Sequence, residues 1–236
     1  MKLITIFNFP DEYNYNRLCH WWLSQALENT DIPIEIWYRD DITHLNIKTD
    51  RVKLKRKPEI ELQQLLPEGI ITDKVKHNVG FKLYNLCQES EPFIFVDADA
   101  IILKNIQPLL DAAADKPFIA VDHQNIPGHT SHIPGKFLNS GVQVCSDSKF
   151  LDFKTIMKYQ QKFSKFLYPG TDQSMLKTYF KYTGYDYTHP GIGFEWNHCA
   201  GVHGCIDNIC INHYWYNFKP WNIDCLLWLK YITHCK

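Results

Sequence analysis

In the stretch PFIFVDADAIIL, residues 92–103, an apolar run that fits a buried strand ends in two carboxylates, Asp97 and Asp99, separated by Ala98. Residues i and i+2 of a strand point to the same side, so Asp97 and Asp99 converge while Ala98 points away. Two neighbouring carboxylates repel unless a cation lies between them, and Mg²⁺ or Mn²⁺ prefers such oxygen ligands and also binds diphosphates. Because ligands of open α/β sheets gather beyond the carboxyl ends of the strands, this position favours a metal site over a strand-end cap.

Short apolar runs alternate with longer segments of helical periodicity on both sides of this stretch. Such alternation is typical of an α/β sheet rather than of an all-α or all-β domain. No internal repeat or linker interrupts it. The predicted strands cover residues 3–7, 34–38, 93–96, 118–122, 141–145 and 209–214, and the predicted helices cover 15–28, 72–87, 108–115, 150–167, 172–182 and 223–232.

The composition predicts a globular chain without a nucleic-acid partner. The 236 residues are 45% hydrophobic and carry a formal net charge of -1, which allows a sizeable core. Binding to phosphates of a nucleic acid requires clustered Lys and Arg. The one basic cluster, residues 51–57, alternates its cations with Val52 and Leu54, as an edge or surface strand does.

The start of the chain and its cysteines predict a cytoplasmic protein. Asn8, Pro10 and Asp11 interrupt the first apolar run before the core of a signal peptide could form. No uncharged stretch approaches the roughly 20 apolar residues of a membrane span. The eight cysteines are therefore predicted to be free thiols. We expect the apolar tail, residues 221–236, to pack on the domain, with peripheral contact at a membrane surface as the alternative.

Three later segments offer groups that the D-x-D stretch lacks. HYWYNFKPW, residues 213–221, supplies an imidazole as a third metal ligand and a lysine for phosphate oxygens. FLNSGVQV, residues 137–144, puts a polar turn with a small residue at the mouth of a strand, where a ligand can come close. GTDQSML, residues 170–176, is an N-capped helix start that presents a carboxylate and an amide. Taken alone, HYWYNFKPW is better explained as an aromatic packing motif, and Thr171 or Asp172 as a helix cap.

The order of the four segments resembles the glycogenin-type glycosyltransferases, family eight, over nearly the whole chain. The resemblance implies an α/β chain with a GT-A type (Rossmann-like) fold, in which helices flank a mixed central sheet. It implies a single domain over residues 1–236, with a nucleotide-sugar-binding half at about 1–110 and a sugar and acceptor half, closed by the C-terminal segment, at about 111–236. Where the family has a glycine three residues after the late histidine, this sequence has Tyr216.

The same resemblance implies a metal-dependent transfer of a sugar from a UDP-hexose to a glycan, lipid or protein acceptor, with retention of anomeric configuration. The implied cofactor is Mn²⁺, with Mg²⁺ as a substitute. Asp97, Asp99 and His213 become the metal ligands. The implied donor contacts are Asn8, Tyr13, Tyr15, Lys82, Asp97, Ala98, Asp99 and Lys219, and the implied catalytic residues at the transferred sugar are Asn139, Asp172 and Gln173.

Two other classes of protein stay open. A haloacid-dehalogenase-type phosphatase also uses a strand-terminal D-x-D, but Ala100 and Ile101 stand where its threonine is expected, and the motif lies in mid-chain. A zinc-binding interaction module is the other, because zinc prefers thiolate and imidazole ligands, although the spacings match no standard C-x2-C pair. Its ligands would be His198, Cys199, His203, Cys205, Cys210 and His213.

Overall fold

The structure of the protein, a computed structural model, describes residues 1–8, 12–66, 71–122, 138–163, 171–199, 208–214 and 218–222. Its centre is a six-stranded mixed sheet with the strand order β3-β2-β1-β4-β7-β6. The strands are parallel except β7, which runs antiparallel to its neighbours β4 and β6. Their bounds are β1 Lys2–Ile6, β2 Ile34–Tyr38, β3 Val52–Arg56, β4 Phe93–Val96, β6 Phe118–Asp122 and β7 Leu138–Cys145.

A small second sheet, of order β5-β9-β8, joins segments that are far apart in the sequence. It consists of β5 (Ala100–Ile102), β9 (Ile211–His213) and β8 (His198–Cys199). In the antiparallel pairing of β5 with β9, Ala100 lies opposite His213. The small sheet therefore carries the late histidine to the D-x-D stretch.

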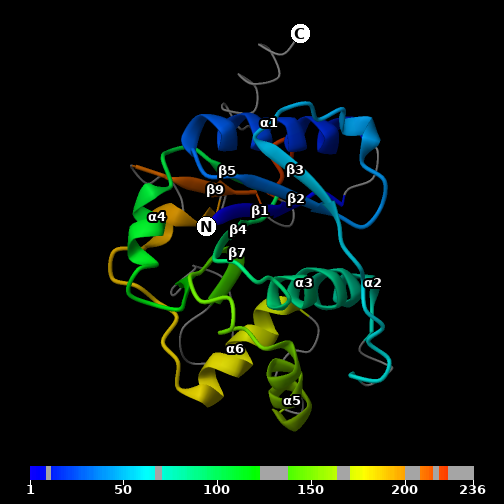
Figure 1. Cartoon of the computed structure of the whole chain (residues 1–236), viewed down its shortest axis with the longest axis vertical. Helices are drawn as coiled ribbons and strands as arrows, with labels where there is room; N and C mark the ends of the chain where they lie inside the picture. Colours follow the sequence, from blue (N-terminus) through cyan, green and yellow to red (C-terminus); the bar gives the residue numbers. More distant parts are fainter. Residues whose placement is uncertain are drawn as a thin grey trace.

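Helices cover both faces of the large sheet (Figure 1). On one face lie α1 (Tyr13–Asn29), α4 (Gln107–Ala112) and the small sheet. On the other face lie α5 (Phe153–Phe163), α6 (Asp172–Thr183) and a continuous helix. That helix passes from α2 (Asp73–Val75) through a π-helix (Lys76–Leu83) into α3 (Tyr84–Cys87). No helix in the described ranges has the length and apolar character that crossing a bilayer requires.

The strand sequences explain the two-sided core. Alternate residues of a strand point to opposite faces, and a sheet covered on both faces requires continuous apolar runs. In β4, Ile94 and Val96 join the core cluster beneath α1, whereas Phe93 and Phe95 join the cluster beneath the helices of the other face. The polar groups that follow such strands are left at the carboxyl edge of the sheet, where the site forms.

The fold class predicted from the sequence is confirmed, but the turn expected at residues 139–141 is wrong. These residues belong to β7, in which Asn139 pairs with Val121 of β6. The polar side chains are tolerated inside a strand because Asn139 Oδ1 accepts the Gly141 N–H at 2.8 Å. The segment therefore continues the sheet up to the site instead of turning away from it.

Most other predicted elements are present with shifted ends. The helix expected from residue 150 begins at Phe153, because Asp152 accepts the Thr155 N–H at 2.8 Å and caps it. The basic cluster 51–57 forms the edge strand β3, as predicted. The helix predicted at 223–232 lies outside the described residues. Cys19, Cys87, Cys145 and Cys210 are free thiols, as predicted.

Candidate metal and donor site

Asp97 and Asp99 lie in the turn that joins β4 to β5. The Asp97 N–H donates to the Gly141 carbonyl at 2.8 Å, and the Ala100 N–H donates to the Asp97 carbonyl at 2.9 Å. The Asp99 carbonyl accepts the Tyr214 N–H at 2.7 Å, which attaches the turn to the end of β9. Backbone hydrogen bonds therefore hold both carboxylates at the carboxyl edge of the large sheet.

His213 completes a group of three potential metal ligands. Its Nε2 lies 3.2 Å from Asp99 Oδ1 and 3.9 Å from Asp97 Oδ2. One ligand atom from each of the three residues lies within 4.8 Å of the others, and no other trio of His, Cys, Asp or Glu in the described part of the chain converges in this way. Ala98, between the aspartates, is buried. The structure thus brings together the three residues predicted as metal ligands.

Lys82, a buried lysine of the π-helix, connects the D-x-D turn to α6. Its Nζ lies 2.9 Å from Asp97 Oδ1 and 3.0 Å from Asp172 Oδ2, and it also donates to the Ser140 carbonyl at 3.1 Å. Burial alone would lower the pKa of Lys82, but Asp172 and Asp97 outweigh it and raise the pKa. Lys82 therefore remains charged although it is buried.

Asp172 and Gln173 form the first turn of α6. Thr171 caps this helix: its side chain accepts the Ser174 N–H at 3.3 Å, and the Ser174 side chain accepts the Thr171 N–H in return. Asp172 is buried against Lys82, and Gln173 is half-buried. Of the two residues predicted to lie under the transferred sugar, Asp172 is therefore linked to the D-x-D turn through Lys82, and Gln173 follows it in the same helical turn.

Lys219 approaches the site from the C-terminal segment. Its ammonium forms an ion pair with Asp99, one of the three metal-ligand candidates. The segment is anchored by Trp221, whose ring meets the Tyr15 ring edge to face with centroids 5.0 Å apart. Burial alone would raise the pKa of Asp99, but His213 and Lys219 outweigh it and lower the pKa. In contrast, burial raises the pKa of Asp97, and the charge on Asp99 adds to this effect.

The donor atoms and the charge of the site fit a hard divalent cation. Two carboxylates and one imidazole are ligands that Mn²⁺ accepts, and Mg²⁺ shares the preference for the oxygens. The carboxylates of Asp97, Asp99 and Asp172 face the two ammonium groups of Lys82 and Lys219, which leaves one negative charge when the imidazole is neutral. A divalent cation reverses the sign of this total and makes the site suitable for a diphosphate.

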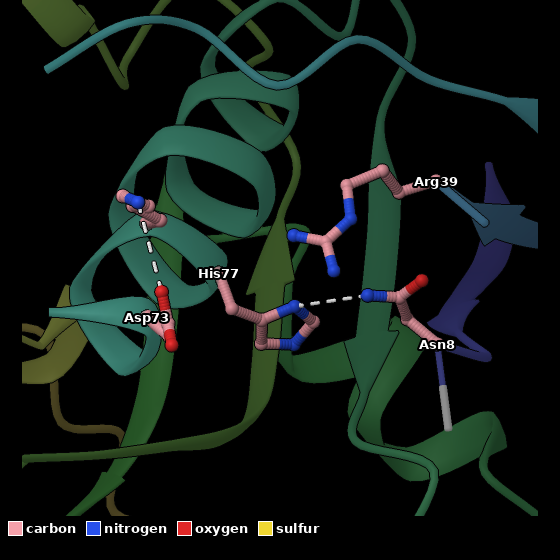
Figure 2. A pocket seen from close by; sticks show the side chains of 5 residues that line it. Asn8, Arg39, Asp73 and His77 are labelled. Carbon is pink, nitrogen blue, oxygen red and sulfur yellow. Dashed lines mark hydrogen bonds and ion pairs between the residues drawn. The ribbon is translucent and has the colours of Figure 1, made fainter. Parts of the chain in front are cut away.

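A cavity of about 320 Å³ opens at the carboxyl ends of β1 and β2. Asn8 follows β1 and Arg39 follows β2, while Asp73, Lys76 and His77 come from the helix opposite. Figure 2 shows Asn8, Arg39 and His77 pointing toward one another, with Asn8 Nδ2 3.4 Å from His77 Nδ1. Burial lowers the pKa of His77, so the cavity presents an uncharged ring beside an amide and a guanidinium.

The residues predicted to cradle the base lie in different places. Asn8 lines the cavity. Tyr13 is 67% exposed, and the Arg17 guanidinium lies 4.0 Å from the centre of its ring. Tyr15 contacts Trp221. Of the three, the structure puts Asn8 at the cavity and gives Tyr15 a part in anchoring the Lys219 segment.

Three side chains of this region were not predicted from the sequence. Arg39 could have been found, because it directly follows the predicted strand 34–38 just as Asp97 follows its strand. His77 lies five residues before Lys82 on the same helix, a spacing without special meaning in an ordinary α-helix. Asn197 contacts His213 from the turn that precedes β8, and nothing in its local sequence points to this contact.

The described cysteines and histidines do not form the zinc cluster considered above. His198 Nδ1 lies 2.8 Å from Asn212 Oδ1, and His213 faces the two aspartates. Cys199 and Cys210 are buried. The remaining candidates, at positions 203 and 205, lie outside the described residues. The arrangement does not favour a zinc module.

The strand order, with a D-x-D turn at the carboxyl edge, defines the GT-A fold. The chain is similar to a crystal structure of an active-site mutant of LgtC, with a TM-score of 0.67 and 15% identity over 99% of this chain and 96% of that one. For the crystal structure of galactosyltransferase LgtC in complex with donor and acceptor sugar analogs, the TM-score is 0.66 and the sequence identity is 15%. The match covers 99% of this chain and 94% of that one. For the glycosyltransferase GlyE of Streptococcus pneumoniae TIGR4, the TM-score is 0.63 and the sequence identity is 15%. The match covers 98% of this chain and 59% of that one. These likenesses establish the fold.

Sequence similarity adds one relative of unassigned function. No family model matches the chain. Uncharacterized protein R707 of Acanthamoeba polyphaga mimivirus is 29% identical over an alignment of 163 residues, and the match covers 62% of this chain. The match spans 56% of that relative's length.

Proposed function

We propose that the protein is a metal-dependent glycosyltransferase that moves a hexose from a UDP-sugar to an acceptor with retention of anomeric configuration. The observation that carries the proposal is the convergence of Asp97, Asp99 and His213, with ligand atoms within 4.8 Å of one another, at the carboxyl edge of a GT-A sheet. The phosphatase alternative is not favoured, because the chain has this fold throughout.

The donor nucleoside is assigned to the cavity lined by Asn8, Arg39 and His77, and its diphosphate to the D-x-D side of the sheet edge. Residues of about 1–110 then bind the nucleotide, and residues of about 111–236 hold the sugar and the acceptor within one domain. The single domain is supported by the large sheet, because residues of about 1–110 contribute β1 to β4 to it and residues of about 111–236 contribute β6 and β7. Tyr13 and Tyr15 remain predicted contacts of the base.

The chemistry of the proposed reaction requires stabilisation of the leaving group. When the anomeric C–O bond breaks, its electron pair moves to the diphosphate, and a fixed cation such as Lys219 offsets the charge that builds there. A divalent metal held by Asp97, Asp99 and His213 would supply Lewis-acid stabilisation of the same charge.

The transferred sugar is assigned to the start of α6. Its transition state is expected to resemble an oxocarbenium ion, and the buried carboxylate of Asp172 can stabilise such a positive charge. Gln173 would orient the sugar hydroxyls, and Asn139 remains a predicted sugar contact. A cytoplasmic location and a glycan, lipid or protein acceptor also remain predictions.

The proposal is tested by thermal shift with a panel of nucleotide sugars, each with and without Mn²⁺, because a ligand of the native state raises the melting temperature. We expect UDP-hexoses to raise it when Mn²⁺ is present. Because water is the acceptor available in this assay, slow hydrolysis of the donor should release UDP and the free hexose. Asp99→Asn should remove the metal-dependent shift, whereas Asp50→Asn, at an exposed position, should keep it. The proposal is wrong if no nucleotide sugar shifts the wild type, or if the shift of Asp99→Asn equals that of the wild type.

A further inference from the structure

A buried row of hydrogen bonds leads from β7 to the ring of His213. The Gly141 N–H donates to Asn139 Oδ1 at 2.8 Å, and Asn197 Nδ2 donates to the same oxygen at 3.0 Å. On its other side, Asn197 Oδ1 lies 2.9 Å from His213 Nδ1. Asn139, Asn197 and His213 are 2%, 0% and 4% exposed, so water does not compete for these bonds.

The direction of every bond in this row follows from its first donor. A backbone N–H can only donate, so the Asn139 atom that receives the Gly141 N–H is the oxygen. Asn197 must then present its NH₂ group to that oxygen and its own oxygen to His213. Nδ1 of the His213 ring therefore carries a proton, which it donates to Asn197 Oδ1, and Nε2 is the ring nitrogen that faces Asp99 and Asp97.

At Gly141, the backbone of β7 leaves room for the His213 ring. A Cβ atom at Gly141 would lie 2.3 Å from His213 Cε1 and 2.6 Å from Nδ1, closer than real contacts allow. Gly141 also sits across from Asp97, whose N–H it accepts. The glycine of the 137–144 segment thus accommodates the His213 ring.

We propose that Asn197 is a positioning residue that, together with Asn139, holds His213 as the Nδ1–H tautomer and presents Nε2 to the metal. The inference rests on the proposed function, because it assigns Nε2 to the metal of that site. Outer partners of a ligating histidine fix its tautomer and its ring orientation, and their loss typically lowers metal affinity about 10- to 100-fold. Asn197 thereby acts through His213 without touching metal or substrate.

The first test reads the tautomer directly in the intact, metal-free protein. Two-bond ¹H–¹⁵N correlation spectra show whether Nδ1 of a histidine ring carries a proton. The signal of His213 is identified among the 11 histidines by its loss in His213→Gln. We expect a protonated Nδ1 in the wild type and in Asn197→Asp, which keeps an acceptor for that proton, and loss of this preference in Asn197→Leu. A wild-type spectrum in which Nδ1 of His213 carries no proton overturns the proposal, whatever the variants do.

The second test measures Mn²⁺ binding by the electron paramagnetic resonance of the free ion. Asn197→Leu should raise the dissociation constant about 10- to 100-fold, and Asn197→Asp should restore most of the affinity. The matched control is Asn212→Leu, which removes another buried asparagine that bonds a histidine, His198, without reaching the carboxylates. We expect this control to lower the melting temperature but to keep the Mn²⁺ affinity.

The outcomes separate the inference from the proposed function. If the wild type binds Mn²⁺ and UDP-hexose, and Asn197→Leu binds Mn²⁺ equally well, the positioning role is wrong and the proposed function stands. If the wild type binds neither ligand, the proposed function is wrong and with it the assignment of Nε2 to a metal, while the spectrum still decides whether the row of asparagines sets the tautomer. If Asn197→Leu does not fold, the wild-type spectrum and Asn197→Asp decide.

Discussion

Lys82 Nζ is buried on the π-helix and lies 2.9 Å from Oδ1 of Asp97, a half-buried residue directly after β4. The same ammonium lies 3.0 Å from Asp172 Oδ2 at the start of α6. One cation therefore fixes the spacing between a carboxylate assigned to the metal and a carboxylate assigned to the sugar. The π-helix supplies this cation, as such irregular turns often do at functional sites.

Removal of the Lys82 charge should destabilise the fold. Lys82→Met leaves the Asp97 and Asp172 carboxylates without their buried partner, and breaking such a pair from one side typically costs about 3–5 kcal/mol. The control, Lys76→Met on the same helix, removes an exposed pair with Asp73 that contributes about 0–1 kcal/mol. Urea unfolding of both variants measures the difference. Equal losses in the free energy of unfolding would mean that Lys82 is not the structural link described here.

The sequence could predict the D-x-D turn because its information is local. The apolar run before Asp97 fixes the strand, and the two aspartates follow it directly. They converge as predicted, but through the turn that joins β4 to β5 and not through the period of a strand. The order of the later segments was enough to add His213 by resemblance. The small sheet was not predicted in full, because β5 has only three residues and continues directly from the D-x-D turn.

The hydrogen bonds that hold the His213 ring could not be predicted from the spacing of residues in the sequence. Asn197 lies 58 residues from Asn139 and 16 residues from His213, and these separations carry no periodicity. The contacts exist only because β7, β8 and β9 end at one place. Asn139 and Gly141 were singled out correctly as polar and small, but the partner that approaches them in the structure is the His213 ring.

Gly141→Ala tests the space that the His213 ring requires. A Cβ atom here would lie 2.6 Å from His213 Nδ1, so the ring must move away from the two aspartates, and Mn²⁺ affinity should fall by about tenfold or more. At Gly191 an added Cβ meets no atom closer than 3.4 Å, so Gly191→Ala is the control and should bind Mn²⁺ normally. Titration calorimetry of both variants checks this. Normal binding by Gly141→Ala would show that the ring has another place to go.

The half-buried ring of His77 predicts a loss of stability in mild acid. Burial lowers its pKa in the folded state, and Lys82 and Arg39 lower it further. The unfolded chain therefore binds a proton at higher pH than the folded protein does, so stability is full above about pH 6.5 and falls as the pH drops through the folded pKa. His77→Gln should flatten this dependence of stability on pH only in part, because partial desolvation and the nearby His44 also lower the pKa of His20. Urea unfolding between about pH 5 and pH 8 measures both slopes, and an unchanged slope in His77→Gln would contradict the assignment.

His213 and Lys219 both contact Asp99, yet their removal should have opposite effects on the metal. His213 offers a ligand, whereas Lys219 is a cation that neutralises the carboxylate a metal would use. His213→Ala should weaken Mn²⁺ binding, and excess Mn²⁺ should recover much of the activity because water can fill the vacated position.

Lys219→Ala should bind Mn²⁺ at least as tightly as the wild type, since Asp99 then loses a competing cation. Its rate constant should nevertheless fall by about two to three orders of magnitude, comparable to the loss of one preorganised donor to a charged leaving group, and added metal should not restore it. Turnover and Mn²⁺ binding, followed over a metal titration of both variants, separate the two roles. If excess Mn²⁺ restores the activity of Lys219→Ala, Lys219 serves metal binding and not the leaving group. If no concentration of Mn²⁺ restores the activity of His213→Ala, the imidazole takes part in the chemical step itself.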